Sequence, residues 1–409
     1  MTRPWFTACL VLGFLGSYCS SQTALSQPID DDEAGLLLKV EKQEQLIRTS
    51  QFRTNAPDIE SELNEMACMI SPEDCDRLNV YLLDLPGLNA FVMPNGAIFV
   101  QTGLLLRVEN ESQIAAVIAH EIVHFREKHS LEAIRRASDQ AATFAILGAV
   151  VGAAGNVAAA GAATPSQMQS VSNASQTAGL MLQSMQVISG LALLAFSREN
   201  EEESDIQGAE LSARAGYSKA AGMELWLAYM AEDEAAGGDQ ALSLLATHPL
   251  PESRVQYLAK FREVDEQGGV KPPTNVIDGL EEFRESWLLM ELRVLHPQQF
   301  GFLADKQQRD WNISPQLVSH LKAESWVRYS DRQGLSRSQI EDAREAAMTA
   351  FASGADLPGG LPADGYRDWG MLAIDMADKA SAKRALTKYL ELSPNAWDAQ
   401  FIKKKLDGL

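Results

Sequence analysis

The sequence predicts an α+β protein, in which a mostly helical first domain with a small β-sheet is followed by an all-α domain. Two observations support this. Short apolar runs rich in branched and aromatic residues occur at residues 80–83 and 97–100, separated by turn residues. Helical patterns cover residues 33–47 and 58–69 before these strands, and from Thr102 onward the pattern is helical throughout.

Residues 1–26 have the features of a secretory signal peptide. Arg3 supplies a positive charge, residues 5–15 are apolar but too short to span a bilayer comfortably, and small residues precede position 27. An uncleaved anchor is the alternative, and a bulky residue before Cys19 argues against lipidation there. We therefore expect cleavage after Ser26 and a periplasmic location.

Export would leave two cysteines in the mature chain, Cys68 and Cys75. An even pair in an oxidising compartment predicts a disulfide that closes a small loop. Two free thiols are the simpler alternative.

The charge balance is acidic, with 35 Lys plus Arg against 55 Asp plus Glu and a formal net charge of −20. Binding to nucleic acid depends on cations that neutralise phosphates, so this class of partner is excluded. By the same reasoning, the chain as a whole would gain little from anionic lipid headgroups.

In the region 139–197 only the first residue, Asp139, is charged, and the next charged residue along the chain is Arg198. Two stretches, 141–163 and 177–196, are long enough to cross a membrane, but both are diluted by alanine or interrupted by small and polar residues. We interpret the region as a helical hairpin beside the active site, with a transmembrane hairpin as the alternative.

Residues 266–276 are typical of a linker, and residues 277–409 are predicted to form a separate helical domain. Near its end, small and large apolar residues alternate on two helices in a way that resembles one tetratricopeptide repeat. These residues are Trp369, Leu372 and Ala373, then Ala382, Leu386 and Tyr389.

The stretch AHEIVHFREKH begins at Ala119 and holds three of the six histidines. In a helix His120 and His124 lie one turn apart, so both imidazoles can bind one divalent metal. Glu121 can reach a water on that metal, and the pattern H-E-x-x-H is typical of zinc metalloproteases. His129 follows as a surface residue or a partner of a ligand.

Catalytic zinc needs a third protein ligand. The candidates lie in an acidic run that opens the helix after Ser197, where a solvated helix face is the alternative. Glu201 and Asp205 are four residues apart and face the same way. Spacing does not choose among the glutamates 199, 201, 202 and 203.

Five blocks in order resemble the zinc peptidase family of the CAAX prenyl proteases and HtpX, and within it the periplasmic BepA-like group, which joins a protease and chaperone to a tetratricopeptide domain. The blocks are Ala90-Phe91 to Leu104, His120 to His124, Ser197 to Asp205, Gly216-Tyr217, and His248-Pro249 to Arg254.

This resemblance implies a zincin-type peptidase domain over residues 27–265 and one Zn²⁺ per chain. It implies that Glu201 completes the metal site of His120 and His124, that Glu121 is the general base, and that Asp205 is a proton donor or orients a histidine.

The resemblance also implies that His248 can reach the zinc and hold the enzyme inactive, although a histidine before proline is more often structural. Arg254 has two candidate roles, stabilising an oxyanion or pairing with an acid of the site. The segment 89–100 can bind an extended substrate along a sheet edge, or it is simply a core hairpin.

Three functions follow. The first is an exported zinc endopeptidase of the gluzincin type, acting on misfolded or stalled envelope and outer-membrane proteins and contacting a membrane or an outer-membrane assembly machine. The second is a chaperone that binds clients through its helical domain, with a latent, His248-gated metal site. The third is a membrane-embedded prenyl-type protease.

Overall fold

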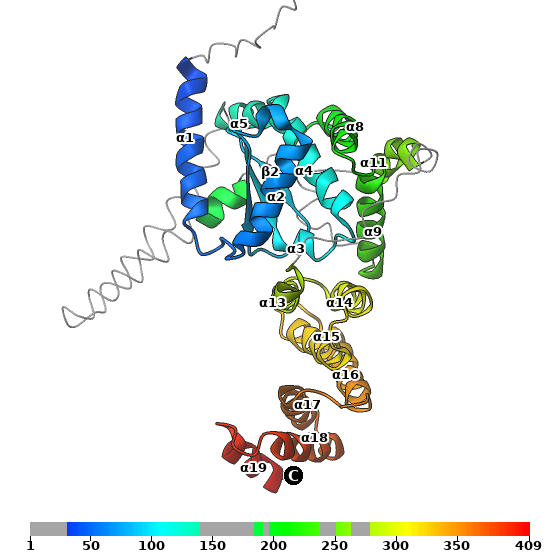
Figure 1. Ribbon diagram of the computed structural model, residues 1–409. Coiled ribbons are helices and arrows are strands. Elements are labelled where there is room, and N and C mark those ends of the chain that lie inside the picture. The colour runs from blue at the N-terminus through cyan, green and yellow to red at the C-terminus, as the bar shows by residue number, and fades with distance from the viewer. Residues whose placement is uncertain (1–30, 140–183, 191–195, 238–250, 263–278) are drawn as a thin grey trace, which may run out of the picture.

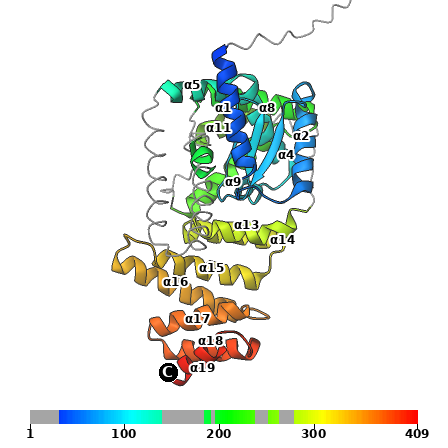
Figure 2. The same ribbon diagram turned by 90° about the vertical axis from the view of Figure 1, so that its left-hand side faces the viewer.

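The computed structural model describes residues 31–139, 184–190, 196–237, 251–262 and 279–409. In Figure 1 an N-terminal part, in which helices surround a small sheet, lies above a column of helices that continues to the last residue. Figure 2 shows this column from the side, with its helices stacked in order from α13 to α19. The predicted α+β class, mostly helical with a small sheet, is confirmed.

The sheet has three strands in the order β1-β3-β2. β1 (Asn79–Leu83) and β3 (Ala97–Gln101) are parallel, whereas β2 (Ala90–Val92) pairs with β3 as an antiparallel hairpin. The turn of the hairpin contains Gly96, whose φ of 92° and close approach to the Arg77 carbonyl leave no room for a side chain. The sequence predicted a small sheet of strands and hairpins, and the parallel pairing of β1 with β3 was not predicted.

Helix α2 (Pro57–Ile70) closes the outer edge of β1. The Asn64 side chain donates to the Val80 carbonyl at 2.9 Å and accepts from the Val80 N–H at 2.8 Å. Glu60 accepts from the Leu82 N–H at 2.7 Å. Side chains therefore satisfy backbone groups that would otherwise invite another strand.

The outer edge of β2 is different. The Gln101 N–H donates to the Asn89 carbonyl at 3.0 Å, so by alternation the backbone groups of Ala90 and Val92 lie on the edge that faces away from β3. Within the ranges described above, no strand pairs with this edge. Ala90 on this strand lines a pocket together with His120 and Glu121.

The two faces of the sheet pack against different helices. Phe99 and its neighbours on one face contact α1 (Asp31–Arg48), and Ile98 and Val100 on the other face belong to the core that includes α4 (Glu111–Arg126). The other short and long helices of the N-terminal part are η1 (Pro72–Asp74), α3 (Thr102–Leu105), α5 (His129–Asp139), α8 (Arg198–Arg214), α9 (Ala221–Ala235) and α11 (Pro251–Leu258).

A disulfide joins Cys68 on α2 to Cys75, just after η1. It closes the loop between these two elements. The Arg126 side chain reaches the same loop from the end of α4 and donates to Asp74 at 2.7 Å. The loop is thus attached to the helix that carries the two candidate histidine ligands.

The column consists of helices that pack against their neighbours in sequence, and its first helices share the core of the N-terminal part, which extends to Leu321. The six residues of the predicted repeat lie on α17 and α18, and all are buried. That this helix pair is a tetratricopeptide repeat stays a prediction. The bounds are α13 (Glu281–Glu291), α14 (Pro297–Trp311), α15 (Pro315–Ser330), α16 (Arg337–Ala355), α17 (Ala363–Asp375), α18 (Lys379–Leu392) and α19 (Ala399–Asp407).

The predicted signal peptide, the linker 266–276 and most of the uncharged region 139–197 lie outside the described residues. In the part of the chain that is described, no helix combines the length and the apolar character that crossing a bilayer requires.

Candidate metal centre

Helix α4 presents the H-E-x-x-H pattern from inside the fold. Asn110 caps its N-terminus by accepting from the Gln113 N–H at 3.1 Å, and its residues from Ile118 to Phe125 are all buried. His120 and His124 lie on one side of the helix, and their Nε2 atoms are 2.9 Å apart. The spacing of four residues therefore does bring the two imidazoles to one point.

Helix α8 packs closely against α4 and supplies the carboxylates. Gly208 makes this approach feasible, because a Cβ there would lie 3.0 Å from the backbone nitrogen of His120. Glu201 and Asp205 are buried against α4. The alternatives that spacing left open, glutamates 199, 202 and 203, are exposed.

Three candidate ligands converge. One Glu201 oxygen lies 3.4 Å from His124 Nε2, and the other lies 3.7 Å from His120 Nε2. The ligand atoms of all three residues lie within 4.8 Å of one another. Each residue is 6% exposed or less.

The chemistry of this donor set fits a divalent metal ion. Asp205 Oδ1 lies 2.9 Å from His120 Nδ1, and because a carboxylate only accepts, Nδ1 carries the hydrogen and Nε2 presents a lone pair. That lone pair and the Glu201 carboxylate repel each other in a buried space, and Nε2 of His124 faces the same point. A cation at their meeting point would offset the repulsion, and zinc prefers these donors.

Arg254, on α11, links the two carboxylates of α8. Its Nη1 pairs with Glu201 at 2.9 Å, while Nε and Nη2 donate to Asp205 at 2.7 and 2.5 Å. The guanidinium is 3% exposed and lies 4.1 Å from the centroid of the Trp226 ring. Of the two roles considered for Arg254, this geometry corresponds to pairing with acids of the site.

Tyr257 is a partner of the site that the sequence analysis missed. Its hydroxyl donates to Asp205 at 2.5 Å, one helical turn beyond Arg254. Burial alone would raise the pKa of Asp205, but the charge of Arg254 and the hydrogen bond from His120 hold that pKa well below its ordinary value. Of the two roles expected for Asp205, these contacts correspond to a carboxylate that orients His120.

His129 lies next to His124, the second histidine of the motif. Its Nδ1 lies 3.1 Å from His124 Nδ1, and its Nε2 lies 3.5 Å from Glu203. Burial lowers the pKa of His129, although the nearby Glu203 acts in the opposite direction. Of the two placements expected for His129, the structure shows a buried partner of His124.

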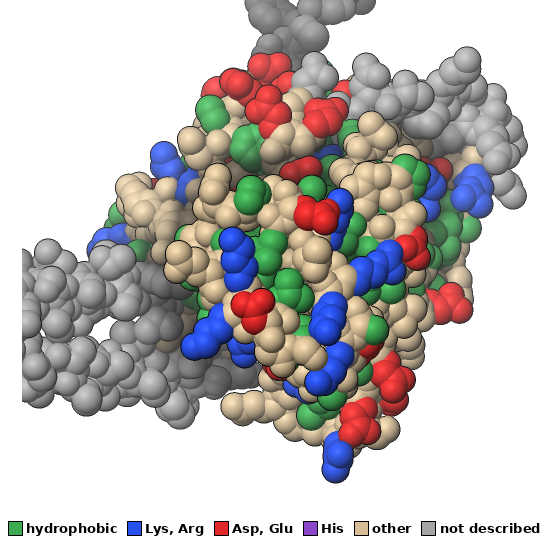
Figure 3. Space-filling view, turned by 90° about the horizontal axis from the view of Figure 1, so that it is seen from below, with side chains coloured by type: hydrophobic (Ala, Val, Ile, Leu, Met, Phe, Trp, Pro, Cys, Tyr) green, Lys and Arg blue, Asp and Glu red, His purple; other side chains and the backbone are tan. Residues whose placement is uncertain are grey.

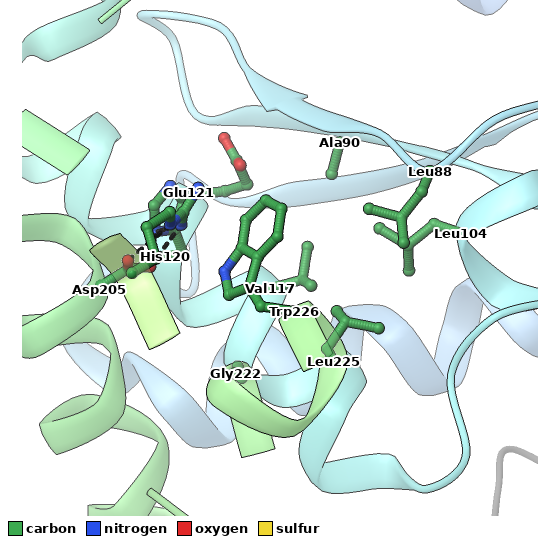
Figure 4. A pocket seen from close by; sticks show the side chains of 12 residues that line it. Leu88, Ala90, Leu104, Val117, His120, Glu121, Asp205, Gly222, Leu225 and Trp226 are labelled. Carbon is green, nitrogen blue, oxygen red and sulfur yellow. Dashed lines mark hydrogen bonds and ion pairs between the residues drawn. The ribbon is translucent and has the colours of Figure 1, made fainter. Parts of the chain in front are cut away.

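Glu121 lies beside His120 in the wall of a pocket. Figure 4 shows both residues at one end of this pocket and Leu88 and Leu104 at the other, with Trp226 between them. The empty volume of this pocket is ≈ 460 Å³, a figure that includes the open solvent at its mouth. A carboxylate next to a candidate metal site can act as a base on a water. The apolar part of the same pocket can hold an apolar side chain of a substrate.

His248 lies outside the described residues, so its approach to the metal stays a prediction. The structure thus brings together His120, Glu121, His124, Glu201, Asp205 and Arg254, whereas Cys68 and Cys75 form a disulfide that contributes no side chain to the pocket.

The sequence is similar to those of known peptidases. The profile of peptidase family M48 matches residues 53–262, just over half of the chain. The chain is 30% identical over 175 residues to the beta-barrel assembly-enhancing protease of Escherichia coli (strain K12), a match that covers 43% of this chain and 32% of that protein.

A second relative is the mitochondrial metalloendopeptidase OMA1 of Schizosaccharomyces pombe, 30% identical over 215 residues, or 53% of each chain. The putative beta-barrel assembly-enhancing protease of Vibrio cholerae is 31% identical over 169 residues, 41% of this chain and 31% of that protein. The matches span only about a third to a half of the length of these relatives.

Proposed function

Because the chain belongs to peptidase family M48, whose members are zinc-dependent metallopeptidases, we propose that it is a zinc endopeptidase of the gluzincin type. His120, His124 and Glu201 would hold one zinc ion. The observation that carries this proposal is the convergence of these three buried groups beside Glu121 and a pocket. The distant glutamate gives the donor set that a catalytic zinc site uses.

A bound zinc ion would supply Lewis acidity and lower the pKa of a water. The chain's own residues do the rest. Glu121 accepts a proton from the water that attacks the scissile carbonyl. Asp205 holds His120 in the tautomer that leaves Nε2 free for the metal, and Arg254 keeps both carboxylates of α8 in place.

The substrate main chain would add to β2 as a further strand. Ala90 and Val92 are 3% and 5% exposed, so an extended peptide would pair with their outward-facing backbone groups only after the atoms that cover this edge of β2 move aside. Ala90 also lines the pocket, so a peptide on this edge passes close to Glu121. The apolar end of the pocket, formed in part by Leu88 and Leu104, suits an apolar side chain of that peptide.

We further propose that the protease is exported and acts on misfolded or stalled envelope proteins, including outer-membrane proteins. The signal-like residues 1–26, the Cys68–Cys75 disulfide and the similarity to beta-barrel assembly-enhancing proteases support this role. A chaperone function of the helical column is the second candidate, since its stacked helices provide a long surface for clients.

Glu121→Gln tests the proposal. We expect casein cleavage to fall by at least about 100-fold, because the attacking water loses its base, while zinc content stays at one ion per chain. Glu201→Gln should lower zinc content as well. Glu202→Gln, an exposed neighbour on the same helix, is the matched control and should change neither.

A Glu121→Gln protein that cleaves casein at the wild-type rate would remove Glu121 from the mechanism. Equal cleavage by the metal-free wild-type protein would remove the metal. Client binding that persists in Glu121→Gln would separate a chaperone function from proteolysis.

A further inference from the structure

The last two helices, α18 and α19, differ in charge from the rest of the chain. Residues 379–409 hold seven Lys or Arg and three Asp or Glu, although the whole chain has a formal charge of −20. All seven cations are exposed. They are Lys379, Lys383, Arg384, Lys388, Lys403, Lys404 and Lys405.

Part of this positive charge is not neutralised within the protein. Arg384 pairs with Asp356 at 2.7 Å, and Lys388 pairs with Glu391 at 3.1 Å. Among the described residues no carboxylate lies within 4.0 Å of the ammonium of Lys403 or Lys404. Both lysines therefore extend toward solvent from α19.

Large apolar side chains are exposed among these cations. Trp397 is 91% exposed, Phe401 is 53% exposed and Leu392 is 48% exposed. Trp397, Phe401 and Lys405 follow one another at intervals of four, and the Lys405 ammonium lies 5.5 Å from the centroid of the Phe401 ring. Ile402, on the other side of α19, is buried in the column and anchors the helix.

Figure 3 shows this end of the molecule face-on. Lys and Arg side chains gather in the middle of the face between apolar side chains, and most Asp and Glu lie toward its margins. The overall acidity of the chain thus conceals a local surface, formed by residues 379–407, that is basic and apolar together. We call it the basic end.

We propose that the basic end docks on the surface of a lipid bilayer that carries anionic headgroups. An indole beside lysines is the combination that prefers the interface between headgroups and acyl chains. Six of the seven cations are lysines, which act as hydrated point charges on flexible stems and suit a diffuse anionic surface. A specific acidic protein partner would instead favour the paired hydrogen bonds of arginine.

Docking through this end also orients the molecule. The metal centre lies in the part of the fold that Figures 1 and 2 show at the opposite end of the column. The acidic remainder of the chain would be repelled by the same headgroups, so only the basic end faces the bilayer. The catalytic part is then held away from the membrane, where it can reach proteins that approach the surface.

The test is cosedimentation of the mature chain, residues 27–409, with vesicles of phosphatidylcholine alone or mixed with phosphatidylglycerol. We expect binding to the mixed vesicles only, weakened by salt. Lys403→Glu/Lys404→Glu should lower the affinity at least about 20-fold, since each lysine near an anionic surface contributes about fivefold. Trp397→Ala should weaken binding too, and in the wild type tryptophan emission should shift to shorter wavelength on binding.

The matched control is Lys39→Glu/Lys42→Glu, the same charge change at exposed positions of α1. It should bind like the wild type, and all variants should keep the wild-type melting temperature and casein cleavage. The proposal is overturned if mixed vesicles are not bound, if both double variants lose binding equally, or if Trp397→Ala binds unchanged. It is also overturned if polyglutamate is bound while vesicles are not, which would indicate an acidic protein partner.

Discussion

Two buried arginines occupy similar settings in this molecule, and they serve different purposes. Arg254 lies between Asp205 and Glu201 at the candidate metal centre, and Arg107 lies between Glu232 and Glu291 where the helical column joins the N-terminal part. Each guanidinium is 3% exposed. In both clusters two carboxylates compensate one cation, so the ion pairs alone do not tell which cluster is the functional one.

Around Arg107 further donors meet the carboxylates. The Gln299 side chain donates to Glu232 at 3.0 Å, and the Gly87 N–H donates to Glu291 at 2.7 Å. Arg107 itself also donates to the Gly103 carbonyl at 2.7 Å. This cluster is a hydrogen-bonded network that joins α9, α13 and α14 to the loop before β2.

Around Arg254 the arrangement is different, because three possible metal ligands converge there. The two imidazole nitrogens and the Glu201 carboxylate point at one another, and the cluster borders a pocket. The comparison teaches that convergent ligand atoms beside a pocket, and not a buried ion pair, distinguish a candidate metal site from a structural network.

The largest effect should come from Arg107→Met. The variant leaves Glu232 and Glu291 buried without their cation, so we expect the free energy of unfolding to fall by about 3–5 kcal/mol. Urea denaturation measures this. Zinc affinity should stay within about twofold of the wild type, because no metal ligand contacts this network.

Arg309→Met is the control for this variant. Arg309 lines the pocket next to the Arg107 network but is 67% exposed, so its loss should change stability by less than about 0.5 kcal/mol. If Arg107→Met were as stable as this control, the network would not hold the two parts together.

A smaller effect, on zinc affinity and not on stability, should follow from Arg254→Met. Without the guanidinium, Glu201 loses the partner that positions it, and we expect zinc affinity to fall by about 10- to 100-fold. Competition with a chromogenic chelator measures this directly. Arg262→Met, an exposed arginine further along the chain, should bind zinc like the wild type; equal affinity in the two variants would contradict the positioning role.

The smallest effect concerns Tyr229, which lies between the two clusters. Its ring contacts Trp226, and burial, followed by the charges of Asp233 and Glu232, raises its pKa to about 12. Within the described residues its buried hydroxyl has no hydrogen-bond partner, so Tyr229→Phe should change stability at pH 7 by less than about 1 kcal/mol.

The difference between wild type and Tyr229→Phe should depend on pH. The phenol stays protonated in the folded state but ionises in the unfolded state above its ordinary pKa of 10.0. Tyrosine at this position therefore costs stability as the pH rises from 10 to 12, a cost that phenylalanine does not have. Melting temperatures at pH 8 and pH 11 measure it, and a constant difference would argue against the raised pKa.

Much of the site could be predicted from local sequence. The spacing of His120 and His124 sets the directions of their side chains, because helical periodicity is a property of the backbone. The choice of Glu201 needed a family resemblance, since neighbouring glutamates on α8 have similar local sequence and differ only in what α8 packs against. Tyr257 was missed for the same reason: it reaches Asp205 from 52 residues away.

The sequence by itself determined the α+β class, the positions of the main helices and two strands, and the pair of histidines on one face of a helix. These follow from hydrophobic periodicity and residue spacing, which act within a few residues. Only the tertiary structure decided which glutamate is buried beside those histidines, how β1 and β3 pair, and that Trp397 and Phe401 are exposed among the cations of the last two helices. Such features depend on contacts between distant segments, and burial and electrostatic fields arise only when those segments pack together.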